Sequence, residues 1–336
     1  MQVSPGLLSG RPAQKILIVY CVFIGLYIVS AFLSPSFRTA MNAYHLLSQV
    51  TPLVIAGIAQ SLVLLSGGFD LSIGSIIALA NIAAASMPYQ ESPLGILLAL
   101  IVPLAIGLAA GTVNGILVGH WQLPPIIVTL ATSSIYLGIA LFWMPIPGGF
   151  LNIQAATRIT GTVGVVPSAL IIFLGITGLI WFFLRYSRLG RYIYIVGGNQ
   201  EVASLVGINI PRVKVQTFAL AGLVASSAGI FLAARMYSGD SSIGTPYVLD
   251  SIAVAVIGGT SLAGGEGGVV GVIAGAFILN LLNNILNMLG ISTFYQYVMK
   301  GIILIMAVAI TSAQGLFATR LQSQTPLTKE DEVDTS

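Results

Sequence analysis

Apolar residues fill this chain in runs of about 20, and each run closes at a short stretch of glycine, proline or polar residues. A run of that length matches the helix needed to cross the hydrocarbon core of a bilayer. The pattern therefore predicts ten membrane-spanning helices, which leaves both chain ends on one side of the membrane. The predicted spans are about 16–33, 44–65, 71–87, 94–118, 123–144, 167–184, 213–234, 248–263, 269–289 and 295–314.

The spans form one transmembrane domain over residues 16–314, between two polar tails, 1–15 and 315–336. The C-terminal tail ends in Lys-Glu-Asp-Glu-Val-Asp-Thr-Ser, a composition that cannot bury enough apolar surface to fold, so we expect it to be disordered. The predicted fold is an all-α integral membrane bundle. Its longest external loop is 145–166, which is interrupted by Pro145, Pro147, Gly148 and Gly149.

Composition supports a membrane protein. Hydrophobic residues make up 56% of the chain and charged residues 7%, whereas soluble domains contain about 25% charged residues. Most of the surface is therefore expected to face lipid. Cys21 is the only cysteine, which excludes an intrachain disulfide and disfavours a metal cluster.

One long polar segment, residues 185–214, interrupts the apolar pattern. It holds five basic residues and a single acidic one, Glu201. Basic residues gather on the cytosolic side of membrane proteins. A cytosolic N-terminus places three basic residues outside (Arg38, Arg158 and Arg235), leaves Lys300 within the last span, and places nine inside: Arg11, Lys15, Arg185, Arg188, Arg191, Arg212, Lys214, Arg320 and Lys329. The charge pattern thus predicts that both termini and the polar segment lie in the cytosol.

The centre of the polar segment predicts a short helix. Asn199 is a good N-cap, Glu201 in the first turn suits the positive end of a helix, and Gly207 can end it in a left-handed conformation. Val202, Leu205 and Val206 then form one apolar face. Such a helix is too short to be stable alone and must dock on something. Two alternatives are open: it packs on its own bundle, or it enters a cleft on a cytosolic ATPase.

The same segment carries a resemblance. Glu201-x-Ala203-x3-Gly207-Ile-Asn209 resembles the cytosolic coupling motif of ABC importer permeases, with Val202 where a second alanine is frequent. Four further segments resemble the ribose-type monosaccharide permeases, and together the matches cover about residues 45–312. They are Leu65-Ser-Gly-Gly-Phe-Asp-Leu-Ser-Ile-Gly-Ser75, Pro125-Ile-Ile-Val-Thr-Leu-Ala131, Gly197-Gly-Asn-Gln-Glu201 and Asn283-Asn-Ile-Leu-Asn-Met-Leu-Gly-Ile291.

The resemblance implies a bacterial inner-membrane importer that carries a monosaccharide. This chain would be one of two permease subunits, the second being another copy or a paralogue. Two cytosolic ATPase subunits would use ATP and Mg, and a periplasmic binding protein would deliver the sugar. No cofactor is expected on this chain. The implied ATPase-coupling residues are Asn199, Glu201, Val202, Ala203, Leu205, Val206, Gly207 and Asn209.

Asp70 is a carboxylate between two apolar spans. Such a residue is costly in a bilayer and is a functional candidate by default. It directly precedes Leu-Ser-Ile-Gly, however, where it can cap the next helix and accept that helix's unpaired N–H groups. We favour the capping role over direct substrate contact, and the family signature fits it.

Four asparagines follow helical spacing in the ninth span: Asn280, Asn283, Asn284 and Asn287. Positions i, i+3, i+4 and i+7 share one helical face. An amide both donates and accepts hydrogen bonds, as a sugar hydroxyl does. Amides also join neighbouring helices, so the stripe predicts either a sugar pathway or helix contacts. Asn81 and Thr129 are further, weaker pathway candidates.

A faint internal echo is present. Gly67-Gly68 and Gly258-Gly259 each stand between two apolar runs, and transporters are often built from duplicated halves with interrupted helices. A true repeat is one interpretation of this echo, and chance among 38 glycines is the other.

Catalysis fits the sequence poorly. The two histidines, His45 and His120, are far apart, and the HExxH, GxSxG and GxxxxGK[ST] patterns are absent from the sequence. The serious alternative to an ATP-driven permease is an ion-coupled secondary transporter of a small polar solute. Such a protein usually carries ionisable residues well inside its spans, and here only Asp70 and Lys300 are candidates.

Overall fold

The computed structural model describes residues 11–88, 91–292, 294–295, 298–299 and 301–302. The chain divides into two compact units, Met1–Ser292 and Thr293–Ser336. Most of the tenth predicted span and the whole tail 315–336 lie outside the described residues.

Helices account for nearly all of the secondary structure of the first unit, with one short antiparallel hairpin, and no further strand lies within the described ranges. The elements are α1 (Arg11–Leu33), η2 (Pro35–Arg38), α2 (Ala40–Leu65), α3 (Ile73–Ala85), α4 (Pro93–Gly119), α5 (Pro125–Trp143), α6 (Ile153–Thr160), β1 (Thr162–Val163), β2 (Val166–Pro167), α7 (Ser168–Tyr186), α8 (Arg188–Gly198), α9 (Gln200–Leu205), α10 (Ile210–Met236), α11 (Tyr247–Ile257) and α12 (Val269–Met288).

Six of these helices are long and apolar enough to cross a membrane: α2, α4, α5, α7, α10 and α12. Three further apolar stretches are shorter, namely Ile16–Phe32 within α1, α3 and α11. The 13 residues of α3 and the 11 of α11 extend only about 20 and 17 Å at 1.5 Å per residue. A hydrocarbon core is about 30 Å thick. The prediction of full spans over 71–87 and 248–263 was therefore wrong in length.

Helices α2 and α10 form the centre of the unit. Within their apolar windows, 89% of α2 and 78% of α10 is buried, against 28–33% in α4, α5 and α7. Contacts radiate from this pair: α10 packs on α2, α3 and α4, while α2 packs on α7, α11 and α12. The outward-facing side chains of α4, α5 and α7 are mostly large and apolar, as expected for helices that border lipid.

Small residues bring α4 and α10 into close contact. Gly107, Gly111, Gly115 and Gly119 recur every fourth residue along α4. A Cβ at Gly111 would lie 2.2 Å from the carbonyl oxygen of Phe218 in α10, and one at Gly222 would lie 2.1 Å from that of Gly107. In a bilayer, where helices gain little from burying apolar surface against each other, such close backbone approach is a main source of association.

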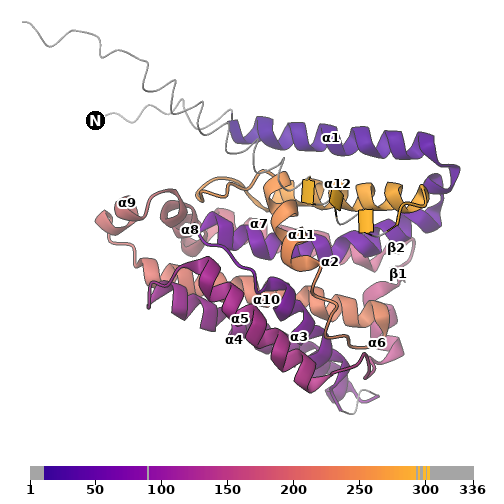
Figure 1. Ribbon diagram of the computed structural model, residues 1–336, viewed down its shortest axis with the longest axis horizontal. Helices are drawn as coiled ribbons and strands as arrows, with labels where there is room; N and C mark the ends of the chain where they lie inside the picture. Colours follow the sequence, from indigo (N-terminus) through magenta and orange to yellow (C-terminus); the bar gives the residue numbers. More distant parts are fainter. Residues whose placement is uncertain (1–10, 89–90, 293, 296–297, 300, 303–336) are drawn as a thin grey trace, which may run out of the picture. The chain divides into compact units, whose positions relative to one another are not determined.

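The unit has two ends, which Figure 1 shows on opposite sides. One end carries α6 and the β1–β2 hairpin, where Phe150 donates to the carbonyl of Ala85 and Leu151 to that of Tyr237. The other end carries α8 and α9, where α8 packs against the last residue of α2, Leu65. We call these the α6 end and the α9 end.

A sequence repeat appears once the turns are compared. Asp70-Leu-Ser-Ile-Gly74 follows α2, and Asp240-Ser-Ser-Ile-Gly244 follows α10. In each turn the aspartate Oδ1 accepts from the backbone N–H and the hydroxyl of the serine two residues on, at 2.7 and 2.6 Å for Ser72 and at 2.8 and 2.7 Å for Ser242. Each turn joins a long helix to a half-length one.

The two copies run in opposite directions. Helix α2 runs from the α6 end to the α9 end, and α10 runs the other way. This arrangement is an inverted repeat, in which half-helices begin within the bundle. The suggested repeat matched Gly67-Gly68 with Gly258-Gly259, and this pairing was wrong. The segment that corresponds to 66–75 is 238–245.

The half-helices α3 and α11 begin next to each other. A Cβ at Gly74 would lie 2.5 Å from the carbonyl oxygen of Gly244, and one at Gly244 would lie 1.8 Å from that of Gly74. Equivalent residues of the two repeats thus meet across their pseudo-symmetry axis. From this point α3 extends toward the α6 end and α11 toward the α9 end, so their N-termini share the middle of the bundle.

This contact predicts that Gly244→Ala destabilises the protein. The added methyl group meets backbone atoms, which cannot move aside as a flexible side chain can, and overpacking of this kind costs about 1–3 kcal/mol. Thermal unfolding of the purified protein in detergent should show a lower midpoint. The control is Gly138→Ala in α5, where an added Cβ meets nothing within 4 Å. Equal midpoints for the two variants would contradict the axis contact.

Candidate functional site

Helix α8 lies at the α9 end and is amphipathic. Ser187 caps it by accepting from the N–H of Gly190 at 2.8 Å, and Ile193 and Val196 are buried on its inner face. Arg188 and Arg191 lie on its exposed side. A helix with an apolar face and a basic face suits the surface of a membrane. Helix α8 was not predicted from the sequence, in which these residues were interpreted as a polar connection. The signal was present in the spacing of Leu189, Ile193 and Val196.

Helix α9 follows α8 after a single residue, Asn199. The Asn199 side chain accepts from the N–H of Val202 at 3.0 Å, and its own N–H donates to the carbonyl of Ile195 in α8 at 3.1 Å. One residue thus ends α8 and caps α9. Because no flexible linker separates the two helices, α9 is held in a fixed orientation relative to α8.

The C-terminus of α9 is also fixed. Gly207 has φ +77°, its N–H donates to the carbonyl of Ser204, and the N–H of Ile208 donates to that of Ala203, both at 3.0 Å. These two bonds define a Schellman motif, which favours glycine at the left-handed position. Asn209 then caps α10 by accepting from the N–H of Arg212 at 3.0 Å. The chain therefore passes from α8 to α10 through a series of capped ends.

The apolar side chains of α9 differ strongly in their exposure to solvent. Ala203 is fully buried against the body, whereas Val202, Leu205 and Val206 are 49%, 86% and 64% exposed. A short helix that docked on its own bundle would bury these three residues. The structure instead presents them outward in this chain. Of the two alternatives for this helix, the geometry favours docking on a partner.

A cavity of about 450 Å³ lies between α8 and the start of α10, next to the C-terminal end of α9. Basic side chains from α8 and α10, Arg188 and Arg212, border it. Its other lining residues are Leu189, Tyr192, Gly207, Ile208, Asn209, Val213 and Gln216. The exposed apolar face of α9 and the basic cavity next to it would complement a partner surface that has an apolar cleft with acidic groups near it.

Asp70 belongs to a buried polar cluster at the start of α3. Its Oδ1 accepts from Ser72, whose hydroxyl in turn accepts from the Asn114 amide of α4 at 2.7 Å. Tyr136 of α5 donates to the carbonyl of Ala110 at 2.9 Å and approaches Asn114 Oδ1 at 3.3 Å. The cluster joins α3, α4 and α5. In this position Asp70 orders the turn before α3.

Thr129 and Asn81 also contact neighbouring elements. The Thr129 hydroxyl lies 2.8 Å from the carbonyl of Pro125 and 3.2 Å from that of Phe69. The Asn81 amide nitrogen lies 3.4 Å from the carbonyl of Gly229, and its oxygen accepts from the N–H of Asp240 at 2.7 Å. Both side chains are fully buried, so they stabilise helix contacts within this chain.

The four asparagines of α12 occupy different environments. Asn280 is buried and its amide lies 3.4 Å from the carbonyl of Leu46 in α2. Asn283 and Asn284 are half-buried and Asn287 is exposed. The Asn284 oxygen is buried and has no hydrogen-bond partner within the part of the chain that the structure describes. Asn280 therefore serves helix contact, while Asn283, Asn284 and Asn287 are less buried along the same face.

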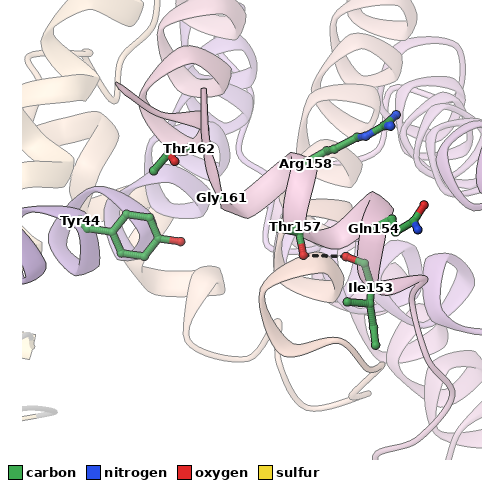
Figure 2. Close-up of a pocket in the computed structure, with 7 residues that line it drawn as sticks. All are labelled: Tyr44, Ile153, Gln154, Thr157, Arg158, Gly161 and Thr162. Carbon is green, nitrogen blue, oxygen red and sulfur yellow. Dashed lines mark hydrogen bonds between the residues drawn. The ribbon is translucent and has the colours of Figure 1, made fainter. Parts of the chain in front are cut away.

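A cavity of about 770 Å³ lies at the α6 end. Figure 2 shows Tyr44 reaching from α2 toward α6, while Arg158 and Gln154 point away from it. The Tyr44 hydroxyl donates to the carbonyl of Thr160. The other residues that line the cavity are Ile153, Thr157, Gly161 and Thr162.

Among the residues that are described, no cluster of three or more His, Cys, Asp or Glu side chains could hold a metal ion.

The sequence matches a known protein family and several curated proteins. Residues 42–308 match the family model described as branched-chain amino acid transport system / permease component. The chain is 40% identical over 306 residues to the ribose import permease protein RbsC of Escherichia coli (strain K12), a match that covers 88% of this chain and 92% of the relative. No solved structure matches the chain.

Two other relatives give the same result. The ribose import permease protein RbsC of Bacillus subtilis (strain 168) is 38% identical, with 86% of this chain and 91% of the relative covered. The galactose/methyl galactoside import permease protein MglC of Escherichia coli (strain K12) is 29% identical, with 88% and 93% covered. Both the family model and the relatives span nearly the whole bundle, so the chain belongs to this family of membrane transport permease components, in the group that contains the ribose and galactose import permeases.

Proposed function

We propose that this chain is the membrane-spanning subunit of an ATP-driven importer and that it translocates a monosaccharide. The observation that carries the proposal is the apolar face of α9, which a series of capped ends holds rigidly and outwardly exposed. The relatives named as ribose and galactose import permeases support the cargo class. A periplasmic protein that binds the sugar would deliver it.

The partner at α9 is a cytosolic ATPase subunit. The sequence contains no GxxxxGK[ST] motif, and that motif holds the phosphates of ATP in such motors. ATP and Mg would therefore be used by the partner, and this chain would supply the knob formed by Val202, Leu205 and Val206. Glu201 at the start of α9 and Arg188 and Arg212 beside it would orient the docked surface through charge.

The orientation follows from the same end of the bundle. The basic residues of α8 and of the start of α10 support a cytosolic α9 end and a periplasmic α6 end. In this arrangement the chain crosses the inner membrane ten times, with α3 and α11 as half-length helices completed by the turns that precede them. Both termini then lie in the cytosol. A second permease subunit, a copy of this chain or a paralogue, would complete the pathway.

Ion coupling receives less support. In the described part of the chain, Asp70 is the one fully buried charged residue, and one of its oxygens already accepts two hydrogen bonds from Ser72. A carboxylate engaged in ordering a turn is poorly suited to exchange ions on every transport cycle. The outward face of α9 has no role in that mechanism.

For the sugar pathway we propose the open side of the α12 stripe. Asn283, Asn284 and Asn287 share one helical face and are less buried than Asn280. Their amides can both donate to and accept from sugar hydroxyls. Asn280, Asn81 and Thr129 would support the wall of the pathway through their contacts with other helices.

Leu205→Asp tests the docking assignment. Leu205 is 86% exposed, so the change should leave insertion and thermal stability intact while placing a charge in an apolar cleft of the ATPase. We expect loss of co-purification with the cognate ATPase subunit and loss of ATP-driven ribose uptake in proteoliposomes.

The matched control is Gln200→Asp, which adds the same charge to the same helix at its N-terminal end, where a negative charge is favourable. It should assemble and transport normally. Normal assembly of the Leu205→Asp variant would show that α9 does not dock on the motor, and uptake driven by an ion gradient without any ATPase would reject the ATP-driven importer as a whole.

Single Asn→Leu changes test the pathway. At Asn283, Asn284 or Asn287, loss of one hydrogen bond to the sugar should raise the KM for uptake by about tenfold in at least one variant. Asn280→Leu should instead lower the unfolding temperature, because its amide contacts α2. Uptake rate, KM and sugar selectivity would be measured for all four variants. Unchanged values in every one would remove the stripe from the pathway.

A further inference from the structure

Three glycine pairs converge at the α9 end. Gly67-Gly68 follows α2, Gly197-Gly198 ends α8, and Gly264-Gly265 lies in the turn between α11 and α12. The N–H of Gly265 donates to the carbonyl of Leu65, the last residue of α2, at 3.1 Å. Gly197 lies between these two segments, so a helix end and a turn that are about 200 residues apart in the chain meet around α8.

The contacts at Gly197 are backbone to backbone. A Cβ at this position would lie 1.8 Å from the carbonyl oxygen of Leu65 and 2.8 Å from the nitrogen of Gly265. A Cβ at Gly264 would lie 2.6 Å from the carbonyl oxygen of Gly197. Side chains can change rotamer and absorb a small displacement, whereas directly packed backbones cannot. A shift of α8 must therefore move both segments.

A hydrogen bond reinforces this packing three residues earlier in α8. The Tyr194 hydroxyl donates to the carbonyl of Gly267 in the α11–α12 turn at 3.0 Å. Burial raises the pKa of Tyr194 above its usual value, so its hydroxyl stays protonated and able to donate. A second buried bond, between the hydroxyls of Ser61 and Thr260 at 3.0 Å, ties the same turn to α2.

The segments that meet here are attached to both half-helices. Gly67 begins the turn that leads through Asp70 to α3, and the α11–α12 turn directly follows α11. On the other side, Asn199 alone separates α8 from α9. Gly197 and Tyr194 thus lie on a short, continuous path of packed backbone from α9 to the elements that meet at Gly74 and Gly244.

We propose that Gly197 and Tyr194 are positioning residues that transmit movement of α9 to the half-helices α3 and α11. The proposal rests on the proposed docking of an ATPase at α9. When the motor moves α9, α8 moves with it, and the contact at Leu65 and Gly265 displaces both half-helices together. Access to the middle of the bundle changes as a result.

The first test is Gly197→Ala in the complete complex of permease, ATPase and binding protein. The added methyl group must separate α8 from Leu65. We expect normal insertion and ATPase assembly, retained ATP hydrolysis, and ribose transported per ATP hydrolysed to fall by about tenfold, within the usual range of coupling between sites. The control is Gly198→Ala, where an added Cβ meets nothing within 4 Å. It should keep the parent ratio.

A milder variant guards against failure of Gly197→Ala to fold. Tyr194→Phe removes only the hydroxyl that donates to Gly267. It should lower the transport-to-hydrolysis ratio by about threefold to fivefold, the worth of one hydrogen bond, with an unfolding temperature close to the parent's. Its control is Tyr186→Phe, at the exposed end of α7.

The outcomes separate the two proposals. If Tyr194→Phe and any folded Gly197→Ala variant transport with the ratio of their controls, the transmission path is overturned even though docking at α9 stands. If the ratio falls while assembly is normal, the path is supported. If Leu205→Asp still assembles with the ATPase, docking itself fails, and the transmission proposal falls with it.

Discussion

Two helices that begin in the middle of an apolar bundle impose the central constraint on this fold. The first N–H groups of α3 and α11 have no partner within their own helices, and lipid supplies none. At the start of α11, turn carbonyls meet part of this need, because Tyr247 donates to Gly244 and Val248 to Thr245. In the Asp-x-Ser-Ile-Gly turns themselves, Asp70 and Asp240 accept from Ser72 and Ser242, which orders the turns, and Gly74 and Gly244 pack without side chains between them. The central packing of α2 and α10, which lead into these turns, follows from this arrangement.

Most of the long helices could be predicted from sequence because lipid enforces a simple rule: a helix in contact with it must be apolar for its full length. That rule holds for α4, α5 and α7, whose outward faces are apolar. It fails for α3 and α11, because protein rather than lipid surrounds them, and hydropathy cannot show where a buried helix stops. Their lengths were overestimated for that reason. The repeat was paired with the wrong segment because a two-residue insertion, Gly68-Phe69, interrupts the match between the turns.

The candidate site shows a similar division. The caps of α9 are local, so Asn199 and Gly207 could be assigned from spacing alone. The exposure of Leu205 could not, because it depends on what the rest of the bundle leaves uncovered. The asparagines of α12 were correctly expected to share a helical face, yet only the position of α2 reveals that Asn280 is used for a helix contact. Gly197 carried no chemical signal at all, and its role emerges only from the backbones around it.

The inverted repeat also bears on how the chain enters the membrane. Two halves with the same sequence pattern would tend to insert in the same direction, and this fold requires opposite directions. The residues that follow α1 and precede α2 carry one basic side chain, Arg38, whereas the polar segment 185–214, from the end of α7 to the start of α10, carries five. Positive charge is retained in the cytosol during insertion. A cytosolic polar segment, as proposed above, would give the second half an orientation opposite to the first, and its charges would be needed before any partner is present.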